Sequence, residues 1–294
     1  MTDRRESLAR LFKSECQLPT LPAILSELNA LFDNPSVSNK CIAQVIMKDQ
    51  AMVSRVLQLS NSAFYAKRQE IRDLTGAVTF LGLKTMRNLV LMLSLMKVFP
   101  RNEPRVPEFQ VEIFWQHSLA AASFSAILAE KIGSVFDESY FIAGLLHDIG
   151  KLVIYHYYPD LFVQTVLRQI EKGETGVMAE ERVLEVNHAD IGAYLAEKWR
   201  FQPEIVRAIQ GHHGQSFAPG EMHVPLTRIA NLFAKAAGFV FPWDCRAVDI
   251  AGDPAWQTTT TNKGRRVDIQ RVTFELYENV DKVRDHVNMM LSQK

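Results

Sequence analysis

Apolar residues recur at intervals of three and four positions along almost the whole chain, the spacing that places them on one face of an α-helix. Alternating apolar and polar runs, which are typical of β-strands, are scarce. The sequence therefore predicts an all-α fold. The predicted helices cover residues 6–15, 21–32, 39–48, 51–60, 73–81, 84–98, 112–132, 138–155, 158–172, 178–187, 189–199, 203–212, 223–237 and 274–291.

Prolines mark the clearest interruption of this helical pattern. Pro100, Pro104 and Pro107 lie among charged and polar residues, and the interior of a helix tolerates proline poorly. A chain of this length also fits two packed lobes better than one continuous core. We therefore predict an N-terminal helical lobe over residues 1–108 and a second helical lobe over residues 109–238.

A second change of pattern begins at Phe239. From there to Arg266 the helical period is lost, and the stretch contains prolines, glycines and four consecutive threonines. We expect residues 239–294 to form a long loop followed by a C-terminal helix that starts near Phe274.

The charge balance argues against a polyanionic partner. The 294-residue chain has 33 basic and 33 acidic residues. Residues 1–108 contain 15 basic and 10 acidic residues, which leaves 18 and 23 for residues 109–294. This asymmetry is too small and too scattered to form a nucleic-acid surface, so we expect no nucleic-acid partner.

Membrane and export functions are also disfavoured. The most apolar stretch, residues 88–96, is much shorter than the roughly 20 residues that a spanning helix needs. The N-terminus lacks the apolar core of a signal peptide. Cys16, Cys41 and Cys245 are odd in number and far apart, which favours neither disulfides nor a cysteine metal site. We predict a cytoplasmic protein without a membrane partner.

Five of the eight histidines stand in positions that suggest a common role. His117 shares a predicted helix face with Phe114 and Phe124, and His188 shares one with Leu195, so both should point inward. A buried polar group without a partner costs about 1–3 kcal/mol. Both imidazoles should therefore have polar partners.

The remaining candidates form two pairs of sequence neighbours, His147-Asp148 and His212-His213. Neighbours on a regular helix point about 100° apart, so both members of a pair can face one centre only where the helix ends or loosens. Glycines supply that break in both cases: Gly150 follows the first pair, while Gly211 and Gly214 flank the second.

Imidazoles and one carboxylate are the donor set of a transition-metal site. A single inward histidine is more often a satisfied core residue than a ligand. Five such histidines with an aspartate favour a shared pocket for one or two divalent ions of Zn, Fe, Mn or Ni. The absence of nearby cysteine fits an open centre better than a closed structural zinc site.

The order of these residues resembles the HD superfamily of metal-dependent phosphohydrolases. The matching positions are His117, then GLLHDIGK at 144–151, NHADIG at 187–192 and GHH at 211–213. The N-terminal half narrows the resemblance to the HDOD domain, the HD-related output domain of bacterial signalling proteins. The segments that carry it are LPTLPAILSELNALFDNPSV at 18–37, IMKDQAMVSRVLQLSNSAFY at 46–65 and AVTFLGLKTMRNLVL at 77–91. The resemblance covers roughly residues 15–238.

The resemblance implies a multi-helical HD-like bundle beside an N-terminal helical lobe, and it implies roles for individual residues. One ion would be held by His117, His147 and Asp148, and a second by Asp148, His188, His212 and His213. In a catalytic member, Asp148 would bridge the ions and Lys151 would contact a substrate phosphate. A solvated helix lysine is the alternative interpretation of Lys151.

Two departures from the catalytic pattern stand out. Asn231 occupies the position where a catalytic HD domain has its last aspartate ligand, so it brings no negative charge. The segment GHHGQSF lacks the GYP sequence that follows the paired histidines in cyclic-di-GMP hydrolases. The first departure weakens the expected binding of the ion at His117 and His147, and the second disfavours cyclic-di-GMP as the substrate.

The histidine pocket and the family resemblance are compatible with two functions, one non-catalytic and one enzymatic. The first is a bacterial signalling output protein with a metal-binding pocket and no catalytic competence, whose partners are other signalling proteins or a small phosphate-containing ligand. The alternative is a metal-dependent phosphohydrolase or nucleotide phosphodiesterase that uses Asp148 and Lys151. A metal-free structural role ranks third.

Overall fold

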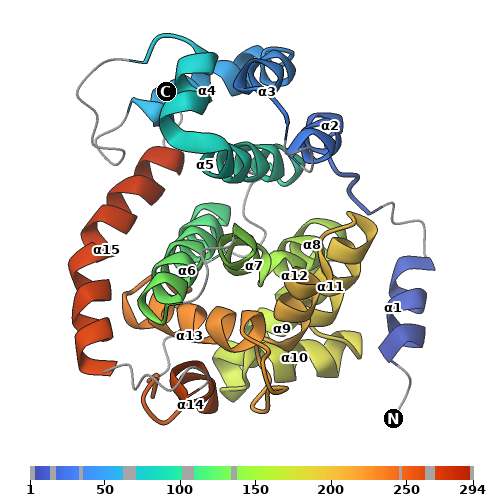
Figure 1. Ribbon diagram of the computed structural model, residues 1–294. Helices are drawn as coiled ribbons and strands as arrows, with labels where there is room; N and C mark the ends of the chain where they lie inside the picture. The colour runs from blue at the N-terminus through green and yellow to red at the C-terminus, as the bar shows by residue number, and fades with distance from the viewer. Residues whose placement is uncertain are drawn as a thin grey trace. The chain divides into compact units, whose positions relative to one another are not determined.

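The computed structural model describes residues 4–13, 18–32, 36–61, 71–100, 109–133, 138–244, 247–261 and 269–291. All regular structure within these ranges is α-helical, so the predicted all-α fold is confirmed (Figure 1). The chain divides into a large unit of Met1–Leu18 and Arg101–Val287 and a small unit of Pro19–Pro100 and Asn288–Lys294.

The small unit packs three short helices against one long helix. Its helices are α2 (Ala23–Phe32), α3 (Asn39–Ile46), α4 (Gln50–Ser60) and α5 (Leu74–Val98). Ser38, Asp49 and Asp73 cap the N-termini of α3, α4 and α5 by accepting hydrogen bonds from backbone N–H groups. Asn61 ends α4, and its side chain bonds both the N–H and the carbonyl of Ile71. The asparagine of the LSNSAFY segment thus ties the end of α4 to the chain that leads into α5.

Helix α5 is the one helix of the described chain that is long and apolar enough to span a membrane by length and composition alone. Gly82 interrupts it, because its φ of 80° and ψ of 158° are not helical. The two parts match the helices predicted at 73–81 and 84–98, and each is shorter than a membrane span. Since Leu89 to Leu95 are all buried, α5 is a core helix.

The large unit is built around three helices that pack on one another, α6 (Val111–Lys131), α7 (Glu138–Leu146) and α13 (His223–Ala236). Phe114, Trp115 and Phe124 of α6 are at most 2% exposed, and burial of such side chains stabilises a fold by about 1.5–3 kcal/mol each. The second group is α8 (Ile149–Tyr157), α11 (His188–Lys198) and α12 (Pro203–Gly211), in which α11 contacts both others.

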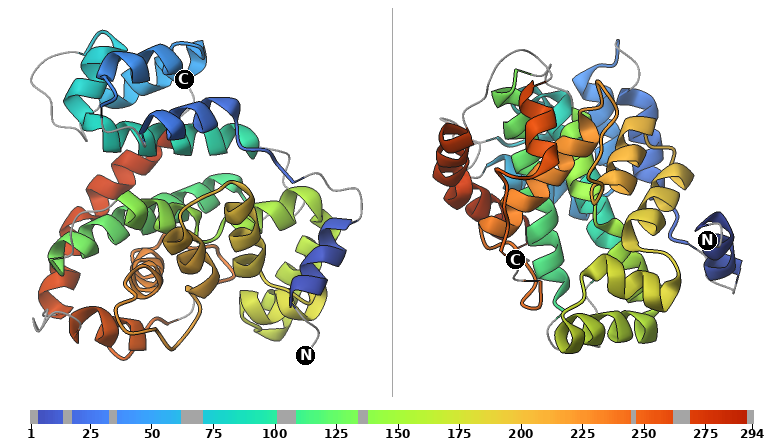
Figure 2. Two further views of the ribbon diagram at one scale, coloured as in Figure 1. Left: turned by 45° about the vertical axis from the view of Figure 1, so that its right-hand side comes forward. Right: turned by 90° about the horizontal axis from the view of Figure 1, so that it is seen from below.

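The remaining helices surround these two groups. They are α1 (Arg4–Lys13), α9 (Pro159–Lys172), α10 (Gly176–Leu184), α14 (Pro254–Thr261) and α15 (Ile269–Leu291). Figure 2 shows α9 and α10 side by side, in agreement with their contacts. Helix α1 lies against α11.

Ion pairs of Arg4 and of Arg10, which pairs with Glu185 at 2.8 Å, and an aromatic stack attach α1 to the rest of the large unit. Arg4 donates to both carboxylate oxygens of Asp190, at 3.2 and 3.1 Å, and to Glu181 at 2.9 Å. The ring of Phe12 stacks on Tyr194 with a centroid distance of 5.1 Å. Because Asp190 belongs to the first turn of α11, α1 contacts the helix that begins at His188.

Three features differ from the sequence-based helices. Helix α15 begins at Ile269 and not near Phe274. The predicted helix over 138–155 is divided into α7 and α8 by a turn at His147 and Asp148, where a break was expected for these two side chains to converge. Helix α14 was not predicted, because threonine-rich sequence has low helix propensity. Here Asp253 bonds the N–H of Ala255 and Trp256 is 6% exposed, so capping and burial outweigh propensity. Pro104 and Pro107 lie outside the described residues.

Candidate metal centre

Close packing of α8 on α11 brings Asp148 toward His188. A Cβ atom on Gly150 would lie 2.0 Å from the carbonyl oxygen of His188 and 2.9 Å from the N–H nitrogen of Gly192. Only glycine allows this approach of two backbones. The glycine after the His-Asp pair therefore serves the contact between the helices as well as the turn.

His188 is the first residue of α11, and its position is fixed by a capping box. The side chain of Asn187 accepts from the N–H groups of Ala189 and Asp190, while Asp190 accepts from the N–H of Asn187. His188 is 1% exposed. The histidine is thus held at a rigid helix start.

His212 and His213 follow α12 directly, where the helix gives way to a turn. The N–H of Gly214 donates to the carbonyl of Gly211 at 2.7 Å. A Cβ on Gly211 would meet Val224 at 2.8 Å, so the chain also packs tightly here. The turn allows both imidazoles to face the same centre, as the flanking glycines predicted.

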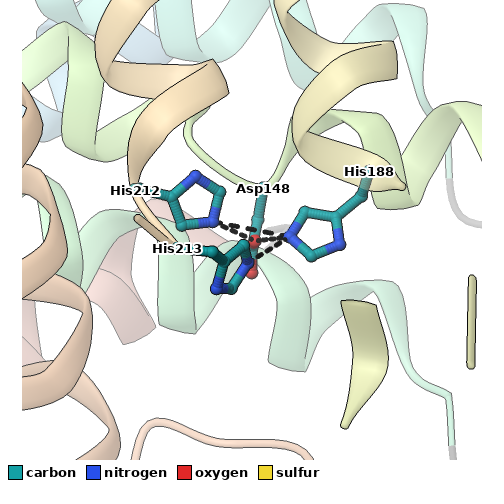
Figure 3. Close-up of side chains that lie close together, drawn as sticks. All are labelled: Asp148, His188, His212 and His213. Atoms are coloured by element: carbon teal, nitrogen blue, oxygen red, sulfur yellow. Dashed lines mark hydrogen bonds and ion pairs between the residues drawn. The ribbon is translucent and has the colours of Figure 1, made fainter. Parts of the chain in front are cut away.

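Four of the predicted ligands form one group, in which three imidazoles surround the Asp148 carboxylate (Figure 3). Asp148 Oδ1 lies 3.1 Å from His188 Nε2 and 3.5 Å from His212 Nε2. His188 Nε2 in turn lies 2.8 Å from His213 Nε2 and 3.4 Å from His212 Nε2. One ligand atom from each residue lies within 4.8 Å of the others.

The second group shares Asp148 and adds the other two predicted ligands. His117 Nε2 lies 3.2 Å from His147 Nε2, and both nitrogens lie near Asp148 Oδ2, at 3.6 and 3.5 Å. His117, His147 and Asp148 are each at most 2% exposed. The structure therefore brings all six candidate ligand residues into two adjoining groups with one common carboxylate.

The outer nitrogens of four imidazoles have defined hydrogen-bond acceptors. The Nδ1 atoms of His117, His147 and His212 bond the carbonyl oxygens of Phe239, Gly144 and Ile209 at 2.6, 2.8 and 2.7 Å. A carbonyl only accepts, so each Nδ1 carries the hydrogen and each neutral ring keeps its lone pair on Nε2. His188 Nδ1 bonds a carboxylate, that of Glu180, at 2.6 Å.

The inner nitrogens therefore face one another with too few hydrogens to bond them all. In addition, Asp148 Oδ1 accepts no well-aligned hydrogen bond although it is buried. Lone pairs packed this closely in a dry interior are unfavourable unless a cation lies between them. The donor set fits a divalent transition ion, since neutral imidazoles with their other ring N–H groups bonded outward are the usual ligands of such ions.

The protonation states of four of the five rings agree with this arrangement. Burial lowers the pKa of His117 to about 4, and burial also lowers the pKa values of His147, His212 and His213. All four rings are neutral near pH 7. His188 differs, because burial lowers its pKa but Glu180 and Asp148 outweigh this and raise it to about 8. A proton on Nε2 then occupies the place that an ion would take.

Asp148 and Lys151 stabilise each other's charges. Burial raises the pKa of Asp148, but Lys151 and the neighbouring histidines outweigh this and hold it well below its ordinary value. Burial lowers the pKa of Lys151, but Asp148 and Asp244 more than offset the effect and raise it. Lys151 Nζ donates to Asp148 Oδ2 at 2.6 Å. The lysine belongs to the centre and is not a solvated helix residue, because its side chain is only 16% exposed.

A cavity of about 530 Å³ adjoins the histidines. Its lining includes Lys151, Glu180, His188 and His213 together with the aromatic residues Phe241 and Trp243. Two further cations line it, but both are paired: Arg228 with Asp253 at 2.7 Å and Lys235 with Asp244. A small anion could approach the candidate metal centre from this cavity.

Several groups that contact the candidate metal centre were not predicted from the sequence. Glu180 looks like any glutamate on the polar face of a helix, and nothing in the sequence separates it from Glu181. The carbonyl of Phe239 is a backbone group in a segment without periodicity. Asn231, whose departure from the catalytic pattern was noted, is buried on α13, and its side-chain oxygen accepts no hydrogen bond within the described chain.

The fold and the site together define an all-helical protein with a buried histidine cluster around a His-Asp pair, a candidate metal-binding helical domain. A family comparison makes this specific: residues 18–215 match the model of the HDOD domain. Because the match covers most of the chain, the protein belongs to the HDOD family, as the resemblance predicted.

Solved structures agree with this assignment. An HDOD domain protein of unknown function from Geobacter sulfurreducens is 26% identical, with a TM-score of 0.86 and 99% of both chains covered. A protein of Shewanella amazonensis SB2B, named as a proposed phosphohydrolase, is also 26% identical, with a TM-score of 0.75 and 97% of both chains covered.

Sequence relatives are longer than this chain. An uncharacterised protein of Treponema pallidum is 28% identical over 215 residues, which are 72% of this chain and 41% of that protein. Ribonuclease Y of Campylobacter curvus is 25% identical over 179 residues, which are 58% of this chain and 29% of that enzyme. The chain thus spans less than half the length of these curated relatives.

Proposed function

We propose that this HDOD protein is a bacterial signalling output module that binds one divalent transition ion firmly in the group Asp148, His188, His212 and His213, without turnover. The observation that carries the proposal is the convergence of Nε2 lone pairs on a single carboxylate. Fe, Mn, Zn and Ni all suit this donor set. A bound ion would supply a Lewis acid at the wall of the cavity.

The charge of the centre favours one firmly held ion over two. Asp148 is the one carboxylate in either group, and Asn231 contributes none. Two divalent ions around a single negative charge repel each other unless an added anion compensates. Two-metal hydrolysis of phosphoesters needs both ions to hold the attacking and leaving oxygens. The position at His117 and His147 would therefore be only weakly occupied. A centre with one firmly held ion suits binding of a small ligand better than hydrolysis of a phosphoester.

The partners of the proposed module follow from the cavity and the balanced surface charge. Lys151 beside the histidines suits a small phosphate-containing ligand, and the module would act on other signalling proteins in the cytoplasm. We propose neither nucleic-acid nor membrane partners, because the sequence has no basic stretch and the one long apolar helix among the described residues, α5, is a core helix buried over Leu89–Leu95.

The second candidate is a metal-dependent phosphodiesterase. The position of Lys151 at the cavity favours it, because a fixed cation there would stabilise charge developing on a phosphate. The similarity to a ribonuclease over part of the chain points in the same direction. Asn231 and the absent GYP segment weigh against it.

Elemental analysis of untagged protein purified without chelator tests the metal. We expect close to one equivalent per chain, whereas less than about one tenth would contradict both metal-based functions. A panel of phosphodiesters, including cyclic nucleotides and a short RNA, then separates the two candidates. The signalling function predicts no turnover by wild type and higher metal occupancy in Asn231→Asp. Turnover that His147→Ala abolishes would establish the enzyme instead.

A further inference from the structure

Glu180 lies directly behind His188 and contacts it twice. Its Oε2 atom is 2.6 Å from His188 Nδ1 and 2.8 Å from the backbone nitrogen of His188. The carboxylate comes from α10, and it is 4% exposed. A single buried oxygen thus holds both the ring and the main chain of the first residue of α11, whose N–H has no partner within its own helix.

This support differs in kind from that of the other imidazoles. His147 and His212 bond carbonyl oxygens three residues earlier in their own chain segments, and His117 bonds the carbonyl of Phe239. Of these four rings, His188 is the one with a charged side chain as its outer acceptor. A carboxylate on the outer nitrogen makes an imidazole a stronger ligand than a neutral carbonyl does.

Glu180 also changes the charge balance of the centre. With Asp148 as the one carboxylate among the candidate ligands, a divalent ion would be only half neutralised. Glu180 adds a second negative charge one imidazole away from the ion. It does so on the side of the centre that has three histidines, and not on the side of His117 and His147.

We propose that Glu180 is a positioning residue for the metal: it fixes the tautomer and the orientation of His188 and supplies outer negative charge, and thereby makes the His188 side the high-affinity position. This inference rests on the proposed metal-binding function. Metal occupancy would then depend on Glu180, a residue that touches neither the ion nor the candidate ligands other than His188.

The contacts of Glu181 provide a matched control. Glu181 is the next residue of the same helix, and it accepts from Asn187 and Arg4, which also belong to the surroundings of His188. It makes no contact with the His188 ring. Glu181→Gln therefore perturbs the same segment without changing the outer acceptor of the ligand.

The test is titration of metal-free full-length protein with Co²⁺ alone, followed by its d–d absorption, together with far-ultraviolet circular dichroism. Glu180→Ala should weaken Co²⁺ binding about 10–100-fold. Glu180→Gln keeps the size and an accepting oxygen but not the charge, so it should weaken binding less and shift the absorption bands. Glu181→Gln should change neither the affinity nor the bands.

The outcomes separate the inference from the function on which it rests. Wild-type affinity in both Glu180 variants, with metal bound by wild type, would overturn the role of Glu180 alone. An equal loss in Glu181→Gln would also overturn it, because the effect would then come from loosening the segment. No Co²⁺ binding by wild type would overturn both. If Glu180→Ala fails to fold, the isosteric Glu180→Gln still decides.

Discussion

The contact between α8 and α11 allows a quantitative test of how the centre is built. In Gly150→Ala, the new Cβ atom would lie 2.0 Å from the carbonyl oxygen of His188, whereas ordinary contact begins near 3.4 Å. The two helices must therefore separate by roughly 1.4 Å along that direction. Backbone atoms cannot rotate away as a side-chain tip can, so we expect a loss of about 3 kcal/mol, the upper end of overpacking costs.

The same displacement should remove His188 from the centre. Ligand distances in metal sites are held within about 0.2 Å, so a shift of this size takes His188 Nε2 out of range while Asp148 stays at the start of α8. Metal affinity should fall by at least about 100-fold. Losing only the hydrogen-bond partner of a ligand costs up to about this much, and here the ligand itself is displaced. Urea unfolding gives the stability, and Co²⁺ titration gives the affinity.

Gly176→Ala is the matched control in the same unit. There the added Cβ meets only the end of the Gln169 side chain, at 3.3 Å, and the position is at the start of α10. Its stability should change by less than about 1 kcal/mol. If Gly150→Ala unfolds at the same urea concentration as this control and binds Co²⁺ like wild type, the proposed role of the helix contact is wrong.

Three further predictions concern contacts outside the histidine cluster. Burial lowers the pKa of His156 to about 4 from 6.5, so the folded state binds fewer protons than the unfolded chain between these values and loses stability as pH falls through this window. Urea unfolding of wild type and His156→Gln at about pH 7.5 and 5 tests this. Both proteins lose unfolding free energy as the pH falls, and because the ring is partly exposed we expect the loss to be only about 1 kcal/mol smaller in His156→Gln. Equal losses in the two proteins would contradict this. Arg4→Ala should cost less than about 1 kcal/mol, because the Arg4 side chain is 60% exposed and Asp190, although only 3% exposed, still accepts from the N–H of Asn187; a larger drop in the unfolding midpoint would show that the pair with Asp190 is worth more than an exposed ion pair. Asp253→Asn should cost about 2–3 kcal/mol in the same assay, because it leaves Arg228, only 15% exposed, without its bidentate partner, and an unchanged midpoint would refute this.

The helices and the inward positions of the histidines could be predicted because the sequence shows apolar residues at helical spacing and glycines where the helices end. His117 and His188 stand on apolar helix faces, and the paired residues stand beside glycines that break a helix. The outer contacts leave no such signal. Glu180 lies among other acidic residues of α10, and only the tertiary approach of α10 to α11 buries it.

Helix α14 shows the same limit for local structure. Its four threonines oppose a helix through their β-branched side chains, so sequence favours a loop. The cap by Asp253 and the burial of Trp256 are tertiary effects, because Asp253 is itself held by Arg228 of α13. Local propensity cannot include a cap that depends on a residue 25 positions away.

The matched HDOD segment ends at residue 215, yet several parts of the centre come from the chain beyond it. The carbonyl of Phe239 holds the His117 ring, and the ring of Phe241 lies 5.9 Å from Lys151 Nζ. Without the backbone carbonyl of Phe239, the outer nitrogen of His117 would lose its acceptor in a buried place, and the tautomer that directs its Nε2 toward Asp148 would no longer be fixed. The family segment thus supplies the candidate ligands, while residues outside it set the orientation of His117 and the surroundings of Lys151. We therefore expect substitutions in this following segment to change metal binding at the His117 side even where all five histidines are kept.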